Sequence, residues 1–205
     1  MSSRSVTPVD LNFKGDRHYL HGTDVYDAAV SSLHARWPDI DGRCRFTFHR
    51  ITSRPLSVIS EPFSQGAARP EKCVAEMHVT GGKDQASVWF VQREGEVTGR
   101  YPYDEDRVVA HCVMEGNRIA LGAVPKAKPI EIVVAMTKRL HNSILKPETG
   151  RWLFTRLDLQ RLLQTRDMDG LSVTLAAPAR LAITRSNVAS RSGDIGSIFF
   201  SVGQT

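Results

Sequence analysis

The sequence predicts an α+β fold made of two tandem units, each with one helix packed against an antiparallel β-sheet. Apolar and polar residues alternate with period two in several segments, as in residues 43–51 (RCRFTFHRI), which is typical of strands with one buried face. Two segments, residues 24–36 and 129–145, carry apolar residues at helical spacing. The order strand, helix, Gly-Arg strand and late hairpin occurs twice, which indicates a diverged duplication.

The repeated order sets the expected domain boundaries. Residues 1–8 are predicted to form a flexible N-terminal arm, residues 9–105 the first unit and residues 106–205 the second. The pairs Gly42-Arg43 and Gly150-Arg151 each follow a predicted helix and open a strand. We therefore interpret the two halves as a fused pair of related units.

The first unit begins with a strand and a polar turn. Gly22 breaks the chain there, and Thr23 or Asp24 can cap the helix that follows. Pro38 ends this helix because it biases the preceding residue away from helical angles. Gly81-Gly82 predicts a hairpin. Strands are predicted at residues 9–13, 43–51, 56–59, 73–80, 86–93 and 97–103.

The second unit repeats this pattern with different residues. Pro129 suits the first turn of its helix, and residues such as Ile132 and Met136 supply an apolar stripe. A late hairpin is expected to turn around Ser192-Gly193. Strands are predicted at residues 107–114, 118–124, 151–157, 171–175, 179–184 and 195–202.

A long helix that comes second in order and is wrapped by an antiparallel sheet resembles the hotdog fold. Two such units in one chain resemble a double hotdog, in which the sheets join edge to edge and so hide their exposed edges. The resemblance covers about residues 9–202 and rests on the order of the elements. Other α+β folds with a duplicated helix stay open.

Hotdog proteins mostly handle acyl groups carried as thioesters on coenzyme A or acyl carrier protein, at sites between two units. The dehydratase branch places a histidine just before the central helix, and His21-Gly22 is similar, although the prolines of that motif are missing. The thioesterase branch places an Asp and a Gly-His element before a helix containing tyrosine. Asp16, His18 and Tyr26 could stand in those positions, with imperfect spacing.

The resemblance implies that His21 is the catalytic base, because an imidazole titrates near neutrality and can move a proton at an acyl carbon. Glu131 lies early in an otherwise apolar helix segment, where a carboxylate is costly unless it is paired or working. We expect Glu131 or Asp24 to be the carboxylate partner of His21. Lys126 and Lys128 occupy the corresponding region of the second half, so one composite site is expected.

Structural roles compete with each catalytic assignment. His21 can bond a loop carbonyl or cap the helix, and Asp24 can act as a cap. Glu131 can favour the helix dipole from the first turn. Asp16 and His18 can form an exposed polar turn.

Composition limits the partners. The net charge is +5, but the basic residues are scattered along the chain, so they suggest a nucleic-acid partner only weakly. The charge fits equally well a phosphorylated cofactor arm, an acidic carrier protein, or a surface with no charged partner. No run of about 18 apolar residues exists, and the N-terminus (MSSRSVTPVD) has no apolar signal region. Cys44, Cys73 and Cys112 lack a CxxC pattern and are expected to be buried thiols in a reducing cytoplasm, without a metal.

The sequence therefore favours a cytoplasmic enzyme acting on acyl thioesters, with a 3-hydroxyacyl dehydratase preferred over a thioesterase. Acyl-CoA or acyl carrier protein would be the partner, and no cofactor beyond the pantetheine arm of that carrier is expected. The protein would be a monomeric pseudo-dimer or a homodimer, without a membrane or nucleic-acid partner. Two alternatives stay open: a non-catalytic module that binds an acyl or aromatic ligand, and a nucleic-acid-binding protein.

Overall fold

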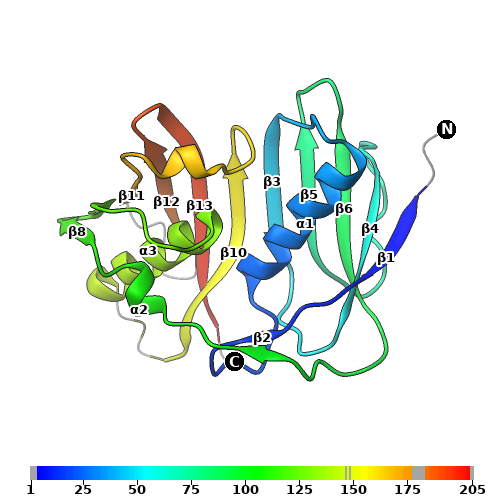
Figure 1. Cartoon of the computed structure of the whole chain (residues 1–205), viewed down its shortest axis with the longest axis horizontal. Helices are drawn as coiled ribbons and strands as arrows, with labels where there is room; N and C mark the ends of the chain where they lie inside the picture. The colour runs from blue at the N-terminus through cyan, green and yellow to red at the C-terminus, as the bar shows by residue number, and fades with distance from the viewer. Residues whose placement is uncertain (1–3, 146, 148, 177–182, 204–205) are drawn as a thin grey trace. The chain divides into compact units, whose positions relative to one another are not determined.

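The computed structural model describes residues 4–145, 147, 149–176 and 183–203, and the chain divides into two compact units, Met1–Tyr103 and Asp104–Thr205. Each unit has its own antiparallel strands and its own long helix (Figure 1). Among the described residues, no helix combines the length and the apolar character needed to span a membrane.

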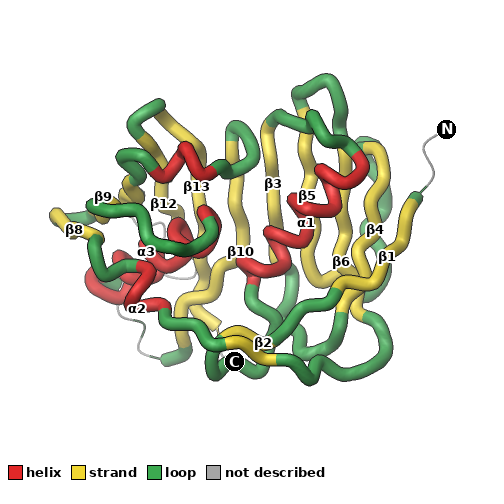
Figure 2. The backbone as a smooth tube through the Cα atoms, in the orientation of Figure 1, coloured by secondary structure: helices red, strands yellow, loops and turns green. Residues whose placement is uncertain are grey.

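The first unit places one long helix on one face of an antiparallel sheet. Its sheet has the order β1-β4-β6-β5-β3, and α1 packs against β4, β5 and β6 (Figure 2). The short strands β2 and β7 pair in parallel beside it. The elements are β1 (Ser5–Val9), β2 (Phe13–Lys14), α1 (Gly22–Arg36), β3 (Arg43–Phe48), β4 (Leu56–Pro62), β5 (Cys73–Thr80), β6 (Ala86–Gln92) and β7 (Arg100–Tyr101).

The buried stripe of α1 makes the core of the first unit. Val25, Ala29 and Leu33 recur at four-residue spacing and are fully buried. Tyr26 packs edge-to-face on Phe46 of β3, with 5.6 Å between ring centroids. This packing fixes the N-terminal turn of α1 over the sheet.

The second unit also places its long helix against an antiparallel sheet. The strand order is β8-β9-β11-β12-β13-β10, and α3 packs against β9, β10 and β11. Its elements are α2 (Glu105–Val108), β8 (Cys112–Glu115), β9 (Arg118–Leu121), α3 (Pro129–Ile144), β10 (Arg151–Leu159), the 3-10 helix η1 (Thr165–Met168), β11 (Ser172–Leu175), β12 (Ile183–Ser190) and β13 (Gly193–Gly203).

The two Gly-Arg pairs open strands as the sequence predicts: β3 begins at Arg43 and β10 at Arg151. Both glycines have positive φ, +144° at Gly42 and +77° at Gly150. A Cβ atom on Gly42 would lie 2.5 Å from the carbonyl oxygen of Thr80, and one on Gly150 would lie 2.8 Å from that of Gly203. Glycine is therefore required where each strand starts beside the end of its neighbour.

The strand order differs between the units. In the first unit β3 borders β5, which is the first strand of the β5–β6 hairpin, whereas in the second unit β10 borders β13, the second strand of the β12–β13 hairpin. Both units run strand, helix, Gly-Arg strand and late hairpin along the chain, but their strands are arranged in a different order in the sheet. The interpretation of the two halves as copies of one unit stays a prediction. The period-two pattern identifies which face of a strand is buried, but it does not identify its neighbours.

Some elements differ from the sequence-based expectation. Ser5–Val9 is not a flexible arm but strand β1, held to β4 by its backbone although most of its side chains are exposed. The strand expected at residues 107–114 begins instead with α2, because Asp104 caps that turn by accepting a hydrogen bond from the backbone N–H of Arg107 (3.2 Å). Residues 179–182 of another expected strand lie outside the described residues.

A buried histidine lies near the end of α3. The side chain of His141 is fully buried, its Nε2 lies 3.0 Å from Ser186 Oγ, and its ring meets Trp152 and Phe200 edge-to-face. Burial lowers the pKa of His141 from 6.5 to about 4. The folded protein therefore holds this imidazole neutral.

We expect His141 to make the protein less stable in mild acid. Above pH 6.5 the imidazole is neutral in both states, but below it the unfolded chain binds a proton that the folded chain excludes until the pH reaches about 4. The loss approaches roughly 3 kcal/mol at the lower end. Urea unfolding between pH 7.5 and 4.5 should show a shallower pH dependence for His141→Gln than for the parent.

A matched control is His34→Gln, because His34 occupies the corresponding place near the end of α1 but is exposed. That variant should keep the parental slope of stability against pH. Equal slopes for His141→Gln and the parent would show that His141 does not carry the acid sensitivity.

Candidate functional site

A buried polar cluster surrounds the N-terminus of α1, within the first unit. We call it the α1 cluster. It brings together β2, the first turn of α1, and β7 with the segment that follows it. Its members are Lys14, His21, Thr23, Asp24, Tyr101 and Tyr103.

Lys14 is the centre of the α1 cluster and is fully buried. Its Nζ donates hydrogen bonds to Thr23 Oγ1 (3.0 Å) and Asp24 Oδ1 (3.3 Å). The same ammonium lies 4.3 Å from the ring centroid of Tyr103, which is a cation–π distance. A buried ammonium is tolerated here because a carboxylate, a hydroxyl and an aromatic face replace its hydration.

Both carboxylate oxygens of Asp24 are engaged in this arrangement. Its second carboxylate oxygen accepts a hydrogen bond from the Tyr101 hydroxyl at 2.7 Å, and only 9% of its side chain is exposed. The prediction that Thr23 or Asp24 caps the helix is wrong, because α1 begins at Gly22, two residues before the expected start at residue 24, and His21 is its N-cap residue. Asp24 instead lies in the first turn, where a negative charge also favours the helix dipole.

His21 is half-buried at the N-cap position of α1. Its Nδ1 lies 2.7 Å from Thr23 Oγ1, and its ring centroid lies 6.3 Å from that of Tyr103. The Thr23 hydroxyl accepts from Lys14 and has one proton and a second lone pair for His21, so it can orient either tautomer of the imidazole. The arrangement holds an imidazole in a fixed orientation at a helix N-terminus.

The other predicted site residues lie apart from the α1 cluster or in the second unit. Asp16 and His18 are exposed in the turn after β2, and Tyr26 belongs to the core. In the second unit, Glu131 Oε2 accepts a hydrogen bond from the backbone N–H of Lys128 at 3.0 Å, so it closes the first turn of α3. The catalytic roles of Asp16, His18, Asp24 and Glu131 stay predictions.

Sequence reasoning missed Lys14 as a member of the site. Lysine is almost never fully buried without a partner, and nothing in the sequence around Lys14 distinguishes it from an exposed strand residue. The usable signal was the placement of three polar residues, His21, Thr23 and Asp24, at the start of a predicted helix with an apolar face.

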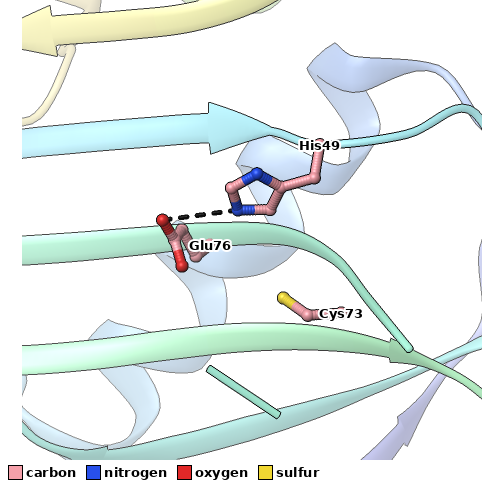
Figure 3. Close-up of side chains that lie close together, drawn as sticks. All are labelled: His49, Cys73 and Glu76. Carbon is pink, nitrogen blue, oxygen red and sulfur yellow. Dashed lines mark ion pairs between the residues drawn. The ribbon is translucent and has the colours of Figure 1, made fainter. Parts of the chain in front are cut away.

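A second cluster of titratable side chains lies at β3 and β5 of the same unit (Figure 3). His49, Cys73 and Glu76 each offer one ligand atom, and these atoms lie within 4.8 Å of one another. Cys44 and Cys73 are buried, as expected, whereas Cys112 is partly exposed. Burial and the charge of Glu76 raise the pKa of the Cys73 thiol to about 11.

No protein-family model and no curated protein matches the sequence. Solved structures do match the fold. A tesB protein from Mycobacterium avium subsp. paratuberculosis aligns with a TM-score of 0.51 and 11% identity, over 97% of this chain and 91% of the other. The dehydratase domain of PpsC from Mycobacterium tuberculosis, solved in complex with C12:1-CoA, aligns with a TM-score of 0.51 and 8% identity, over 99% of this chain and 97% of the other.

Both of these structures are hotdog-fold proteins. This chain has a hotdog-like fold. At 8–11% identity the likeness concerns the fold alone, and residue roles cannot be transferred from it. The hotdog resemblance inferred from element order is confirmed at this level.

Proposed function

We propose that this hotdog protein is a double hotdog that acts on acyl thioesters, with 3-hydroxyacyl dehydration preferred over thioester hydrolysis. The observation that carries the proposal is the position of His21, an oriented imidazole at the N-terminus of the long helix of a hotdog-like unit. Solved proteins of similar fold include one bound to an acyl-CoA, which supports the substrate class.

Dehydration would use the imidazole of His21 for proton transfer. The neutral ring takes the proton from C2 of a 3-hydroxyacyl thioester, and the electron pair of that C–H bond forms the C2–C3 double bond as the C3–O bond breaks. The imidazolium then returns its proton to the C3 hydroxyl, which leaves as water. The first turn of α1 would favour the negative charge that develops on the thioester oxygen. Thr23 holds the imidazole, and Lys14 with Asp24 holds Thr23.

Hydrolysis is the second catalytic possibility. There His21 would take a proton from water as it attacks the thioester carbon, and the carrier thiol would leave with a proton. The two reactions differ in their products: dehydration leaves the thioester intact, whereas hydrolysis releases a free thiol.

A non-catalytic acyl-binding protein is the second candidate function, and a specific observation favours it. The carboxylate of Asp24 binds Lys14 and Tyr101, and that of Glu131 binds the backbone of its own helix. Both predicted partners of His21 are therefore engaged in structural contacts. A protein of this kind would bind the same ligands without turnover.

The partners follow from the substrate class. Acyl-CoA and acyl carrier protein both present a phosphorylated pantetheine arm, which suits a chain with a net charge of +5. We propose no metal or redox cofactor for this reaction. Nucleic acid is not expected as a partner. We propose that the protein acts either as a monomeric pseudo-dimer or as a homodimer.

The test is a panel of 3-hydroxyacyl and simple acyl thioesters of coenzyme A, followed by mass spectrometry of the products and by a thiol reagent. Dehydration predicts an enoyl thioester that is lighter than its substrate by the mass of one water, about 18 mass units, and it predicts no release of free thiol. Thiol release would establish the thioesterase instead. Saturable binding without product would establish the binding protein, and neither binding nor product would refute all three.

A further inference from the structure

The cluster at His49, Cys73 and Glu76 depends on an irregular stretch of backbone. Residues three apart on a regular strand point to opposite faces, so Cys73 and Glu76 would not share one. A β-bulge shifts the register between Cys73 and Ala75, and Lys72 just before it has a positive φ of 58°. Bulges re-aim side chains and are frequent beside functional sites.

The bulge brings two ligands of β5 to a third one from β3. His49 directly follows β3, and its backbone N–H donates to the carbonyl of Val74 at 2.8 Å. Its Nε2 lies 3.3 Å from Glu76 Oε1, and Figure 3 shows this pair beside the sulfur of Cys73. The side chains of His49 and Glu76 are 21% and 18% exposed, whereas Cys73 is 5% exposed. The cluster is thus reachable from solvent and has a buried floor.

We propose that His49, Cys73 and Glu76 form a binding site for a divalent transition-metal ion of the zinc type. The site would use one nitrogen, one sulfur and one oxygen ligand and would keep a fourth position for water or another ligand. It shares no residue with the α1 cluster and is independent of the proposed acyl-thioester activity.

The ligand types and spacing fit such an ion. Zinc accepts cysteine, histidine and carboxylate ligands in tetrahedral geometry. At metal–ligand distances near 2.1 Å, two tetrahedral ligands lie about 3.4 Å apart, close to the 3.3 Å between His49 Nε2 and Glu76 Oε1. The Cys73 thiol donates to the carbonyl of Ala75 at 3.3 Å. It would exchange that contact and its proton for the metal.

A positively charged side chain, that of Arg69, already contacts His49. Arg69 Nη1 lies 2.9 Å from His49 Nδ1 and 3.1 Å from His49 Nε2. Arg69 is exposed on the loop between β4 and β5, so its long side chain can move away. A metal ion would have to displace this guanidinium. Removing Arg69 should therefore tighten metal binding, whereas removing any ligand should weaken it.

The test is titration of the full-length reduced protein with Co²⁺, which reports a thiolate ligand by near-ultraviolet absorption and four-coordination by its visible bands. We expect one ion per chain. Each of the three ligand variants, Cys73→Ser, His49→Ala and Glu76→Gln, should weaken Co²⁺ binding. The loss should exceed the factor of about 10–100 that is typical when a residue that only supports a ligand is changed. Arg69→Ala should bind more tightly than the parent.

The matched control is Cys44→Ser, because Cys44 is also a buried cysteine, on β3. Cys44 lies two residues before Phe46 and therefore on the same face of β3, the face that packs toward α1. It should keep both the stoichiometry and the thiolate band. Far-ultraviolet circular dichroism checks that each variant is folded. If Cys73→Ser does not fold, two other variants still test the proposal, because Glu76→Gln should weaken Co²⁺ binding and Arg69→Ala should tighten it. Absence of stoichiometric binding to the parent, or a thiolate band retained by Cys73→Ser, would overturn the proposal.

Discussion

Asp24→Ala is expected to lower the free energy of unfolding by about 3–5 kcal/mol, the usual cost of removing one partner of a buried ion pair. The ammonium of Lys14 is fully buried, and Asp24 is its carboxylate partner at 3.3 Å. Without Asp24, the Lys14 ammonium must lose its proton, or the Lys14 side chain must move to solvent and disturb β2. The Tyr101 hydroxyl also loses its acceptor. Urea unfolding at neutral pH measures the change.

Two variants test this explanation of the Asp24 effect. Asp16→Ala removes an exposed carboxylate from the preceding turn and should change stability by less than about 0.5 kcal/mol. Lys14→Met should cost less than Asp24→Ala, because the remaining carboxylate keeps Tyr101 and the N-terminus of α1 as partners. If Asp24→Ala were as mild as Asp16→Ala, the α1 cluster would not be the buried network described here.

His21→Ala is expected to lower turnover of an acyl thioester by about 10²–10⁴-fold while the protein stays folded, the usual contribution of a positioned acid or base. His21 makes no side-chain cap bond to α1, so its removal should leave the helix in place. Thr23→Val, which deletes the hydroxyl that contacts His21 Nδ1, should lose a smaller factor. Initial rates measured beside circular dichroism spectra separate loss of chemistry from loss of fold.

Glu131→Gln tests the predicted partner of His21 in the other unit. The variant keeps an oxygen that can accept from the backbone of Lys128, so α3 should stay intact. A loss of rate comparable to that of His21→Ala would mean that Glu131 transfers a proton itself. Parental rates in Glu131→Gln would remove Glu131 from the mechanism and leave His21 without that partner.

The sequence was most informative where burial is periodic. The helices α1 and α3, the strand starts after Gly42 and Gly150, and the hairpin at Gly81-Gly82 all follow from apolar spacing and glycine positions. Strand β1 was missed because it is paired through its backbone and has no buried face. The different strand order of the two sheets was also beyond reach, because pairing partners are set by tertiary contacts.

The candidate site was only partly predictable for a similar reason. His21 and Asp24 could be singled out because they lie at the start of a predicted helix. Lys14 and Tyr101 could not, because their contacts depend on the pairing of β2 with β7. These strands lie side by side although Lys14 and its partner Tyr101 are far apart in the sequence. The group at His49, Cys73 and Glu76 was likewise hidden, because a β-bulge creates it.

The most direct test of the central claim is whether an acyl thioester binds at the α1 cluster. The ring resonances of His21, assigned by comparison with His21→Ala, would be followed while a 3-hydroxyacyl-CoA is added, with exposed His34 as an internal reference. We predict a saturable shift of the His21 signals and an unchanged His34 signal. Unchanged His21 signals at a concentration that saturates binding would contradict the assignment of the α1 cluster as the acyl-thioester site.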